Sequence, residues 1–362
     1  MQQKFSVVQI IDMLNVGGAE RVLVTIANLL HEHGHKIAVI TTVKPGILAS
    51  QLHKEISLIN LNRKWKWNFF KMYRLINIAK QFDVVHIHSS HNLRYFFLAA
   101  TLFRFNKPIF FQEHHGNVIN EKIPWHKKYI YPKTIFIAVS KQLAEWALIK
   151  LHIPAKNVFI LHSTVPKPNA VKTFRKINTD KQIIIVSNFL RNKNIHFAIE
   201  VFEELQKNSD KKISLTIIGQ KYDEIYFQFI RQIITQKNLQ SHINIIQNCT
   251  DIQKLLPDYD FALHTSESES GPLVLIEYLA QGLPFITFDT GEVAEQIKSA
   301  IPEFIMYSFN KIEWVERIKK LLLNSSAELS NKLINLYEIK FSPQAYYKKC
   351  IIIYEAGLRI KK

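Results

Sequence analysis

The chain has 362 residues, 47% of them hydrophobic, which is too long for one ordinary core and suits two domains of roughly 150–200 residues each. No apolar run approaches the roughly 20 residues that span a bilayer, and residues 1–11 lack the apolar core and cleavage site of a secretion signal. The two cysteines, Cys249 and Cys350, provide neither a disulfide framework nor a metal cluster. We therefore expect a cytoplasmic protein.

Positive charge is concentrated in the first half of the chain. The formal net charge is +17, and residues 1–170 hold 22 Lys and Arg against 8 Asp and Glu. This asymmetry predicts an anionic partner for the first half, which could be nucleic acid or a membrane surface.

Short β-branched runs alternate with amphipathic stretches in the first half. The runs predict strands at Phe5–Ile11, Ile37–Thr42, Val84–His88, Pro108–Gln112, Thr134–Val139 and Val158–His162. The amphipathic stretches predict helices at Ala19–His33, Phe69–Gln81, Leu93–Phe105 and Lys141–Leu151.

The alternation stops at a polar, proline-containing stretch, residues 168–179, and then starts again. Strands are predicted at Gln182–Ser187, Ile213–Gly219, Ile243–Gln247, Phe261–His264 and Pro284–Phe288. Helices are predicted at Ile195–Asn208, Ile252–Leu256 and Pro272–Gln281, with a last helix in residues 342–362. Such alternation indicates two α/β domains with parallel sheets, residues 1–167 and 180–341, joined by the linker. Ligands of open parallel sheets bind at the carboxyl ends of the strands, so we expect a cleft between two such edges.

The segment Ser266–Glu277 carries the strongest chemical pattern. A predicted strand ends before it, and Pro272 stands where the first turn of a helix should begin. The unpaired backbone N–H groups of Ser270, Gly271 and Leu273 would then form a seat for a diphosphate. Glu269 and Glu277 would stand roughly 12 Å apart, which suits one carboxylate at a sugar and the other at a ribose.

Five segments in order resemble the retaining glycosyltransferase family 4, which has the GT-B fold: two Rossmann-like domains facing each other across a cleft, with the C-terminal helix crossing back to the first domain. The segments extend from the first strand to about residue 300, and the final helix fits as well. They are Asn15–Arg21, Asp83–His88, Ala138–Lys141, Glu269–Glu277 with Gly282–Pro284, and Asp289–Glu295.

The resemblance implies roles for individual residues. Gly17 and Gly18 would allow a tight loop to approach the donor diphosphate or the acceptor without a Cβ clash. Lys193 falls on the family's diphosphate-binding lysine, where a cation stabilises charge on the leaving nucleotide. Glu277 would hold the ribose hydroxyls, and Glu269 with the amides that follow it would contact the donor sugar.

A histidine of the first domain should also reach the donor sugar. His114 is favoured because Glu113 and His114 match the family's Glu-His pattern at a strand end, and His115 is the alternative. Members of the family are thought to retain anomeric configuration by attack on the same face, so no enzymatic nucleophile is expected.

The sequence departs from the family's pattern at two places. Asn188 stands where the family usually has an arginine, five residues before the lysine, and Arg191 is expected to bind the diphosphate instead. Ser163 and Thr164 replace the family's Asn-Gly before the linker, which puts the contacts there in doubt.

Asp258 and Asp260 resemble the metal-binding Asp-x-Asp of the other large glycosyltransferase fold. In that fold the motif follows a strand, whereas here it precedes the predicted strand Phe261–His264. No metal and no cofactor are therefore expected, since the nucleotide-sugar is itself a substrate.

A basic and aromatic stretch in the first domain suggests where an anionic partner binds. Trp and Tyr favour the water–lipid interface and basic residues favour anionic headgroups, which predicts peripheral attachment to the cytoplasmic face of the inner membrane. Nucleic-acid binding competes for the same charge, but no nucleic-acid module is recognisable and none is expected as a partner. The predicted membrane-facing residues are Arg63, Lys64, Trp65, Lys66, Trp67 and Lys71, with a second patch at Trp125–Lys133.

The resemblance therefore implies a retaining, metal-independent hexosyl- or N-acetylhexosaminyltransferase. Its donor would be a nucleotide-sugar, with UDP as the default base, and its acceptor a glycan or lipid-linked oligosaccharide of a surface polysaccharide. A GT-B epimerase or hydrolase of UDP-sugars remains an alternative. A protein that only binds nucleotides or nucleic acid fits poorly with the presence of both Glu269 and Glu277.

Overall fold

The computed structural model describes residues 4–65, 68–114, 119, 122–169, 180–207, 212–249, 251–324 and 326–360. The chain divides into two compact units. The first consists of residues 1–166 and 343–362, and the second of residues 167–342.

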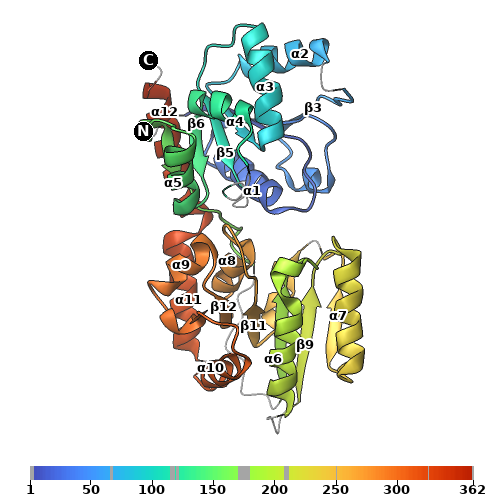
Figure 1. Ribbon diagram of the computed structural model, residues 1–362. Helices are drawn as coiled ribbons and strands as arrows, with labels where there is room; N and C mark the ends of the chain where they lie inside the picture. Colours follow the sequence, from blue (N-terminus) through green and yellow to red (C-terminus); the bar gives the residue numbers. More distant parts are fainter. Residues whose placement is uncertain are drawn as a thin grey trace. The chain divides into compact units, whose positions relative to one another are not determined.

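The N-terminal unit is built on a parallel sheet in the order β3-β2-β1-β4-β5-β6-β7. Its strands are β1 (Ser6–Ile11), β2 (Lys36–Thr41), β3 (Ser57–Asn60), β4 (Val84–His88), β5 (Ile109–Glu113), β6 (Ile135–Ala138) and β7 (Val158–Ile160). Its α-helices are α1 (Gly18–Glu32), α2 (Phe69–Ala79), α3 (Ser90–Leu102), α4 (Trp125–Ile130), α5 (Lys141–Lys150) and α12 (Pro343–Ile360) (Figure 1).

The two faces of this sheet differ in chemistry. One face carries apolar side chains such as Val8, Ile87 and Phe111, which pack against the apolar sides of α2, α3, α4 and α5. On the same strands, the side chains that alternate with these point to the other face and include Gln9 and His86. The polar face lies toward α12, whose tyrosines hydrogen-bond to it.

The C-terminal helix α12 is an integral part of the N-terminal unit, as the fold class predicted (Figure 1). Its Tyr354 hydroxyl lies 2.9 Å from Nδ1 of His86, and its Tyr346 hydroxyl donates to Oε1 of Gln112 over 3.2 Å. Gly357 permits this close approach, because a Cβ there would lie 2.4 Å from the Phe110 ring. The final helix therefore completes the first sheet layer.

The second unit repeats the architecture with a parallel sheet in the order β10-β9-β8-β11-β12-β13. Its strands are β8 (Lys181–Val186), β9 (Ile213–Ile218), β10 (Ile243–Ile246), β11 (Phe261–His264), β12 (Phe285–Phe288) and β13 (Ile305–Met306). Its α-helices are α6 (Ile195–Lys207), α7 (Glu224–Gln236), α8 (Leu273–Ala280), α9 (Gly291–Lys298), α10 (Lys311–Leu323) and α11 (Ala327–Lys340).

Most predicted elements are present, with shifts of a few residues at their ends. Seven of the strands and α-helices were not predicted: the strands β3 and β13 and the helices α4, α7, α9, α10 and α11. The helix predicted at Ile252–Leu256 is wrong, because the chain there forms two 3-10 turns, Ile252–Lys254 and Leu256–Asp258. Pro257 lies inside the second turn, where its ring and missing N–H oppose a continuous α-helix.

Candidate active site

The strand order of the second unit defines a candidate binding position at the carboxyl edge of its sheet. The chain runs from β8 outward to β9 and β10 on one side, and from β11 outward to β12 and β13 on the other. Between β8 and β11 the order reverses, and ligands of such sheets bind at that point. The loop after β8 carries Lys193, and the loop after β11 carries Glu269.

These two loops are fastened to each other by hydrogen bonds. The Thr265 hydroxyl lies 3.1 Å from the carbonyl oxygens of both Lys193 and Asn194, to which it can donate. The Glu267 N–H donates to the Asn192 carbonyl over 2.9 Å. The backbone under Lys193 is thereby fixed to the end of β11, at the carboxyl edge of the sheet.

Glu269 and Lys193 form a short, mostly buried ion pair. Nζ of Lys193 lies 2.6 Å from Oε1 of Glu269, and the two side chains are only 17% and 14% exposed. Nε2 of His264, the last residue of β11, lies 3.3 Å from the same oxygen. The backbone N–H of Glu269 donates to the Thr290 hydroxyl over 3.1 Å. These contacts show that Glu269 is not a solvated surface acid.

The environment of Glu269 keeps it ionised. Burial by itself raises the pKa of this carboxyl, but the hydrogen bond from His264 and the charge of Lys193 outweigh burial and lower the pKa to about 2. Position 291 favours glycine, because its φ is +79° and a Cβ there would lie 3.1 Å from Cβ of Glu269. A fixed carboxylate can accept hydrogen bonds from sugar hydroxyls.

Helix α8 begins a few residues after Glu269 in the chain. Pro272 is the N-cap of this helix, one residue earlier than the first-turn position expected from the sequence. Ser270 accepts a hydrogen bond from the Glu292 N–H through its carbonyl, while a Cβ on Gly271 would meet nothing within 4 Å. The Leu275 N–H donates to the Pro272 carbonyl over 3.2 Å, and the N–H groups of Leu273 and Val274, which precede it at the start of α8, can receive an anion.

Glu277 lies on α8, one turn into the helix, and is 1% exposed. It therefore belongs to the interior of the second unit and is not a surface acid. Its charge contributes to raising the pKa of the neighbouring buried Tyr278, after the larger effect of burial.

Asn188 and Arg191 differ in what they contact. The Asn188 side chain accepts a hydrogen bond from the Gln220 N–H over 3.0 Å, which ties the loop after β8 to the loop after β9. Arg191 is exposed at the start of the 3-10 turn Arg191–Lys193. Arg191 is thus accessible to a ligand, and Asn188 holds the backbone.

In the N-terminal unit the predicted residues lie at the carboxyl edge of the first sheet. Gly17 is the N-cap of α1 with an extended φ of −151°, and Gly18 is the first residue of the helix. His114 follows β5, and its Nε2 lies 2.9 Å from Nδ1 of His88. His115 lies outside the described residues.

Sequence reasoning missed His264, Thr265 and Thr290, which position Glu269 and Lys193. Each is a common residue type at a strand end or a helix start, and only the strand order brings them together. Asp260 is tied to β8, since its carboxylate accepts from the Gln182 N–H over 2.9 Å at the opposite end of the strands.

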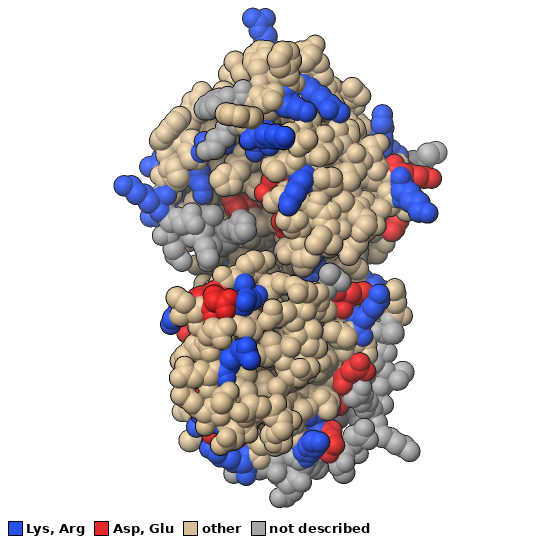
Figure 2. Space-filling view, turned by 90° about the vertical axis from the view of Figure 1, so that its right-hand side faces the viewer, with Lys and Arg blue, Asp and Glu red and all other residues tan. Residues whose placement is uncertain are grey.

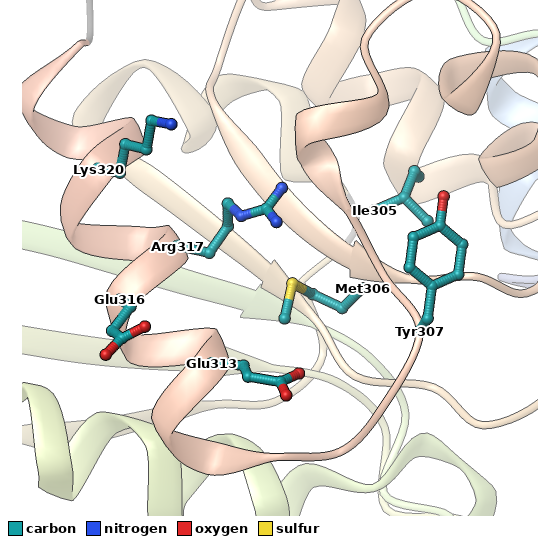
Figure 3. A pocket seen from close by; sticks show the side chains of 7 residues that line it. All are labelled: Ile305, Met306, Tyr307, Glu313, Glu316, Arg317 and Lys320. Atoms are coloured by element: carbon teal, nitrogen blue, oxygen red, sulfur yellow. The ribbon is translucent and has the colours of Figure 1, made fainter.

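Two other features lie apart from these residues. Within the described ranges, His31, His53 and Glu55 form a partly exposed group whose ligand atoms lie within 4.8 Å of one another, as a metal site would require. A cavity of about 310 Å³ lies between β13 and α10 (Figure 3). None of the predicted donor residues is among those that line the cavity, which are Ile305, Met306, Tyr307, Glu313, Glu316, Arg317 and Lys320.

Comparison with solved structures identifies the class. A glycosyltransferase from Rickettsia africae superposes with a TM-score of 0.78 at 19% identity, covering 98% of this chain and 99% of its own. HepE from Anabaena, solved with UDP and glucose, gives a TM-score of 0.78 at 15% identity over 96% and 98% of the two chains. Together with the two parallel α/β units, these matches show the GT-B fold.

Sequence profiles identify the family. The profile described as "Glycosyltransferase Family 4" matches residues 16–167, and that described as "Glycosyl transferases group 1" matches residues 167–336. A capsular polysaccharide biosynthesis glycosyltransferase of Staphylococcus aureus, CapH, is 24% identical over 93% of this chain and 96% of its own length. The chain belongs to the group 1 glycosyltransferases of family 4, and it is a glycosyltransferase.

Proposed function

We propose that the protein transfers a sugar, with retention of anomeric configuration, from a UDP-sugar to a glycan or lipid-linked acceptor of a cell-surface polysaccharide. The observation that carries the proposal is the Lys193–Glu269 pair at the strand-order reversal of the second unit. It offers a cation for the diphosphate and a carboxylate for the sugar at one edge of the sheet. No metal is needed in this proposal, because Lys193, Arg191 and the amides of α8 provide the positive charge.

Names of the relatives support the acceptor class. CapH is described as acting in capsular polysaccharide biosynthesis, and a partial match, 25% identical over 56% of this chain, is a poly(ribitol-phosphate) N-acetylglucosaminyltransferase. UDP is present with glucose in the Anabaena structure. These descriptions favour a UDP-linked hexose or N-acetylhexosamine as donor and a polymeric or lipid-linked acceptor.

We propose further that the N-terminal unit binds the anionic surface of the inner membrane from the cytoplasm. The support is an exposed aromatic group on α2 and the chain before it: Trp65, Phe69, Phe70 and Tyr73. The rings of Phe69 and Tyr73 contact Phe103 at the end of α3. No helix within the described ranges is long and apolar enough to cross a membrane.

The charges around this aromatic group are mostly positive. Lys64 is exposed and Lys71 half-buried, whereas the Arg63 guanidinium stacks on the Tyr95 ring at 4.4 Å and serves packing in part. Lys66 and Trp67 lie outside the described residues. Figure 2 shows Lys and Arg side chains spread over the face of the N-terminal unit that is in view. Near the second patch, Lys133 lies 3.6 Å from the ring centre of Tyr129.

The test combines donor binding with turnover. Thermal stability is measured with UDP-, GDP- and ADP-sugars, for the wild type and for Glu277→Ala, since a ligand that binds only the folded state raises the melting temperature. A shift with UDP-sugars that Glu277→Ala lacks is expected. Release of UDP is then followed with and without a glycan acceptor and with a chelator, and the anomeric configuration of the product is read by NMR.

Each outcome decides between the candidate functions. Release of UDP that depends on acceptor and yields a retained product supports the proposal. Turnover without acceptor would favour the epimerase or hydrolase, and loss of activity with a chelator would overturn metal independence. No stabilisation by any nucleotide-sugar, together with tight and salt-sensitive nucleic-acid binding, would favour the third alternative.

A further inference from the structure

A buried histidine connects the first strand of the N-terminal unit to His114. His88 is the last residue of β4 and is wholly buried. Its Nε2 lies 2.6 Å from Oε1 of Gln9 on β1, and its Nδ1 lies 2.9 Å from Nε2 of His114 after β5. The three residues form one hydrogen-bonded row across the carboxyl ends of β1, β4 and β5, where the strand order of this sheet reverses.

The chemistry of the groups fixes the direction of both hydrogen bonds. An amide oxygen can only accept, so Nε2 of His88 must carry a proton and donate it to Gln9. A neutral imidazole has a proton on one nitrogen only, so Nδ1 of His88 is an acceptor. His114 must then donate from its own Nε2, and in its neutral form its Nδ1 has the lone pair.

The surroundings keep His88 neutral and hold its ring in place. Burial lowers the pKa of His88 well below the ordinary value, and the neighbouring His86 and His114 act in the same direction. The His86 ring stacks on the His88 ring with centroids 4.4 Å apart, and His86 is itself held by the Tyr354 hydroxyl. His88 therefore remains an acceptor for His114 over the whole neutral pH range.

We infer that His88 is a positioning residue that holds His114 as its Nε2–H tautomer, so that Nδ1 is the atom with which His114 accepts a hydrogen bond from a hydroxyl of the bound sugar. This inference rests on the proposed role of His114 at the donor sugar. The tautomer of a functional histidine is set by the hydrogen bond at its other ring nitrogen. Removal of partners that orient an imidazole in this way reduces activity by about 10–100-fold in metal sites, and a similar loss is expected here.

The direct test reads the tautomer without any substrate. The full chain is labelled with ¹⁵N-histidine, and long-range ¹H–¹⁵N correlation spectra are recorded; the His114 signals are assigned by their loss in His114→Gln. The Nε2–H pattern is expected at His114 in the wild type and in His88→Gln, whose amide can accept from His114 and donate to Gln9. In His88→Leu the pattern should change to a mixture of tautomers. An Nδ1–H pattern in the wild type, or an unchanged pattern in His88→Leu, would overturn the inference.

Kinetics then separate this inference from the proposed function. His88→Leu should lower kcat by about 10–100-fold while the Kd for the UDP-sugar changes less than about threefold, and His88→Gln should restore most of kcat. Equal loss of kcat in both variants would count against positioning. If His88→Leu does not fold, Gln9→Met replaces it, because that variant removes the acceptor that fixes His88. If the wild type shows the Nε2–H pattern but has no transferase activity, the proposed function is overturned. The hydrogen bonds from Gln9 through His88 to His114 would still stand.

Discussion

Nζ of Lys193 lies 2.6 Å from Oε1 of Glu269, although 76 residues separate them in the chain. In this state the cation that is proposed to bind the diphosphate is paired with the carboxylate that is proposed to bind the sugar. A donor carries both a diphosphate and a sugar. Its diphosphate can contact Lys193 and its sugar can contact Glu269, in place of the contact between the two side chains. The pair therefore keeps both charges in position where the two side chains are mostly buried and a single unpaired charge would be costly.

Replacement of Lys193 by alanine should weaken donor binding. A hydrogen bond to a charged group contributes about 1.5–3 kcal/mol, so the Kd for the UDP-sugar should rise about 10–150-fold in isothermal titration calorimetry. The matched control is Lys237→Ala, which removes an ion pair of similar length, 2.5 Å to Glu203, between α6 and the end of α7. A Kd that rises equally in both variants would contradict a specific role of Lys193.

The ionised state of Glu269 makes stability depend on pH. Its pKa of about 2 in the folded protein lies below the ordinary value of 4.5. A carboxyl with a depressed pKa stabilises the fold above the unfolded value, and this contribution is lost as the pH falls from 4.5 toward 2. The full contribution is about 3 kcal/mol at pH 6 and roughly half of that at pH 3.

Urea unfolding from pH 3 to pH 6 can measure this effect. The difference in free energy of unfolding between the wild type and Glu269→Gln should be largest at pH 6 and should decrease toward pH 3. A control with Glu292→Gln, an acid at the start of α9, should show no comparable trend. A difference between wild type and Glu269→Gln that stays constant with pH would show that Glu269 has an ordinary pKa.

Arg191 and Asn188 should respond differently to alanine substitution. Arg191 is exposed, so Arg191→Ala should leave the melting temperature unchanged and raise the donor Kd about tenfold, with partial recovery in Arg191→Lys. Asn188→Ala removes the hydrogen bond to the Gln220 N–H and should reduce stability by about 1 kcal/mol. Unchanged donor affinity in Arg191→Ala would show that this arginine does not replace the one absent at position 188.

Membrane binding should depend on the exposed aromatic group of the N-terminal unit. The double variant Trp65→Ser/Phe70→Ser removes side chains that are 76% and 84% exposed, and should reduce flotation with vesicles that contain anionic lipid. The matched control is Ile225→Ser/Leu323→Ser in the second unit, where the side chains are 74% and 85% exposed. Equal flotation of both double variants, or no preference for anionic lipid, would contradict attachment through α2.

How much the sequence predicts differs between the fold and the site. The alternation of strands and helices and the two-unit division follow from periodicity, because buried parallel strands are continuous apolar runs. The strand β3 escapes this reasoning, since Ser57–Asn60 is short and its ends are polar. The two-residue strand β13 is too short to have a period at all.

The sequence predicts candidate site residues where a family pattern marks them, and does not indicate residues that only the fold brings together. Glu269 and Lys193 stand in recognisable segments, but nothing local to His264 or Thr290 shows that each touches Glu269. Gln9, His88 and His114 are likewise unrelated in sequence. They meet because β1, β4 and β5 are neighbours, an order that the sequence alone does not specify.

The last prediction concerns the stability that the attachment of α12 to the first sheet provides. The Tyr354 hydroxyl lies 2.9 Å from Nδ1 of His86, and both residues are wholly buried. Burial lowers the pKa of His86 to about 3, so the ring is neutral and depends on hydrogen bonds to neutral partners. Tyr354→Phe keeps the ring packing and removes only the hydroxyl, which should reduce the free energy of unfolding by about 1–3 kcal/mol.

A substitution on the opposite side of the same helix serves as the control. Ile352 is 62% exposed on α12, so Ile352→Ala should change the free energy of unfolding by less than about 0.5 kcal/mol. Urea unfolding gives both values, and calorimetry should show little change in the Kd for the donor in Tyr354→Phe, because Lys193, Glu269 and Glu277, which are proposed to bind most of the donor, belong to the other unit. Equal stability of the two variants would mean that the tyrosine–histidine hydrogen bond does not hold α12 on the sheet.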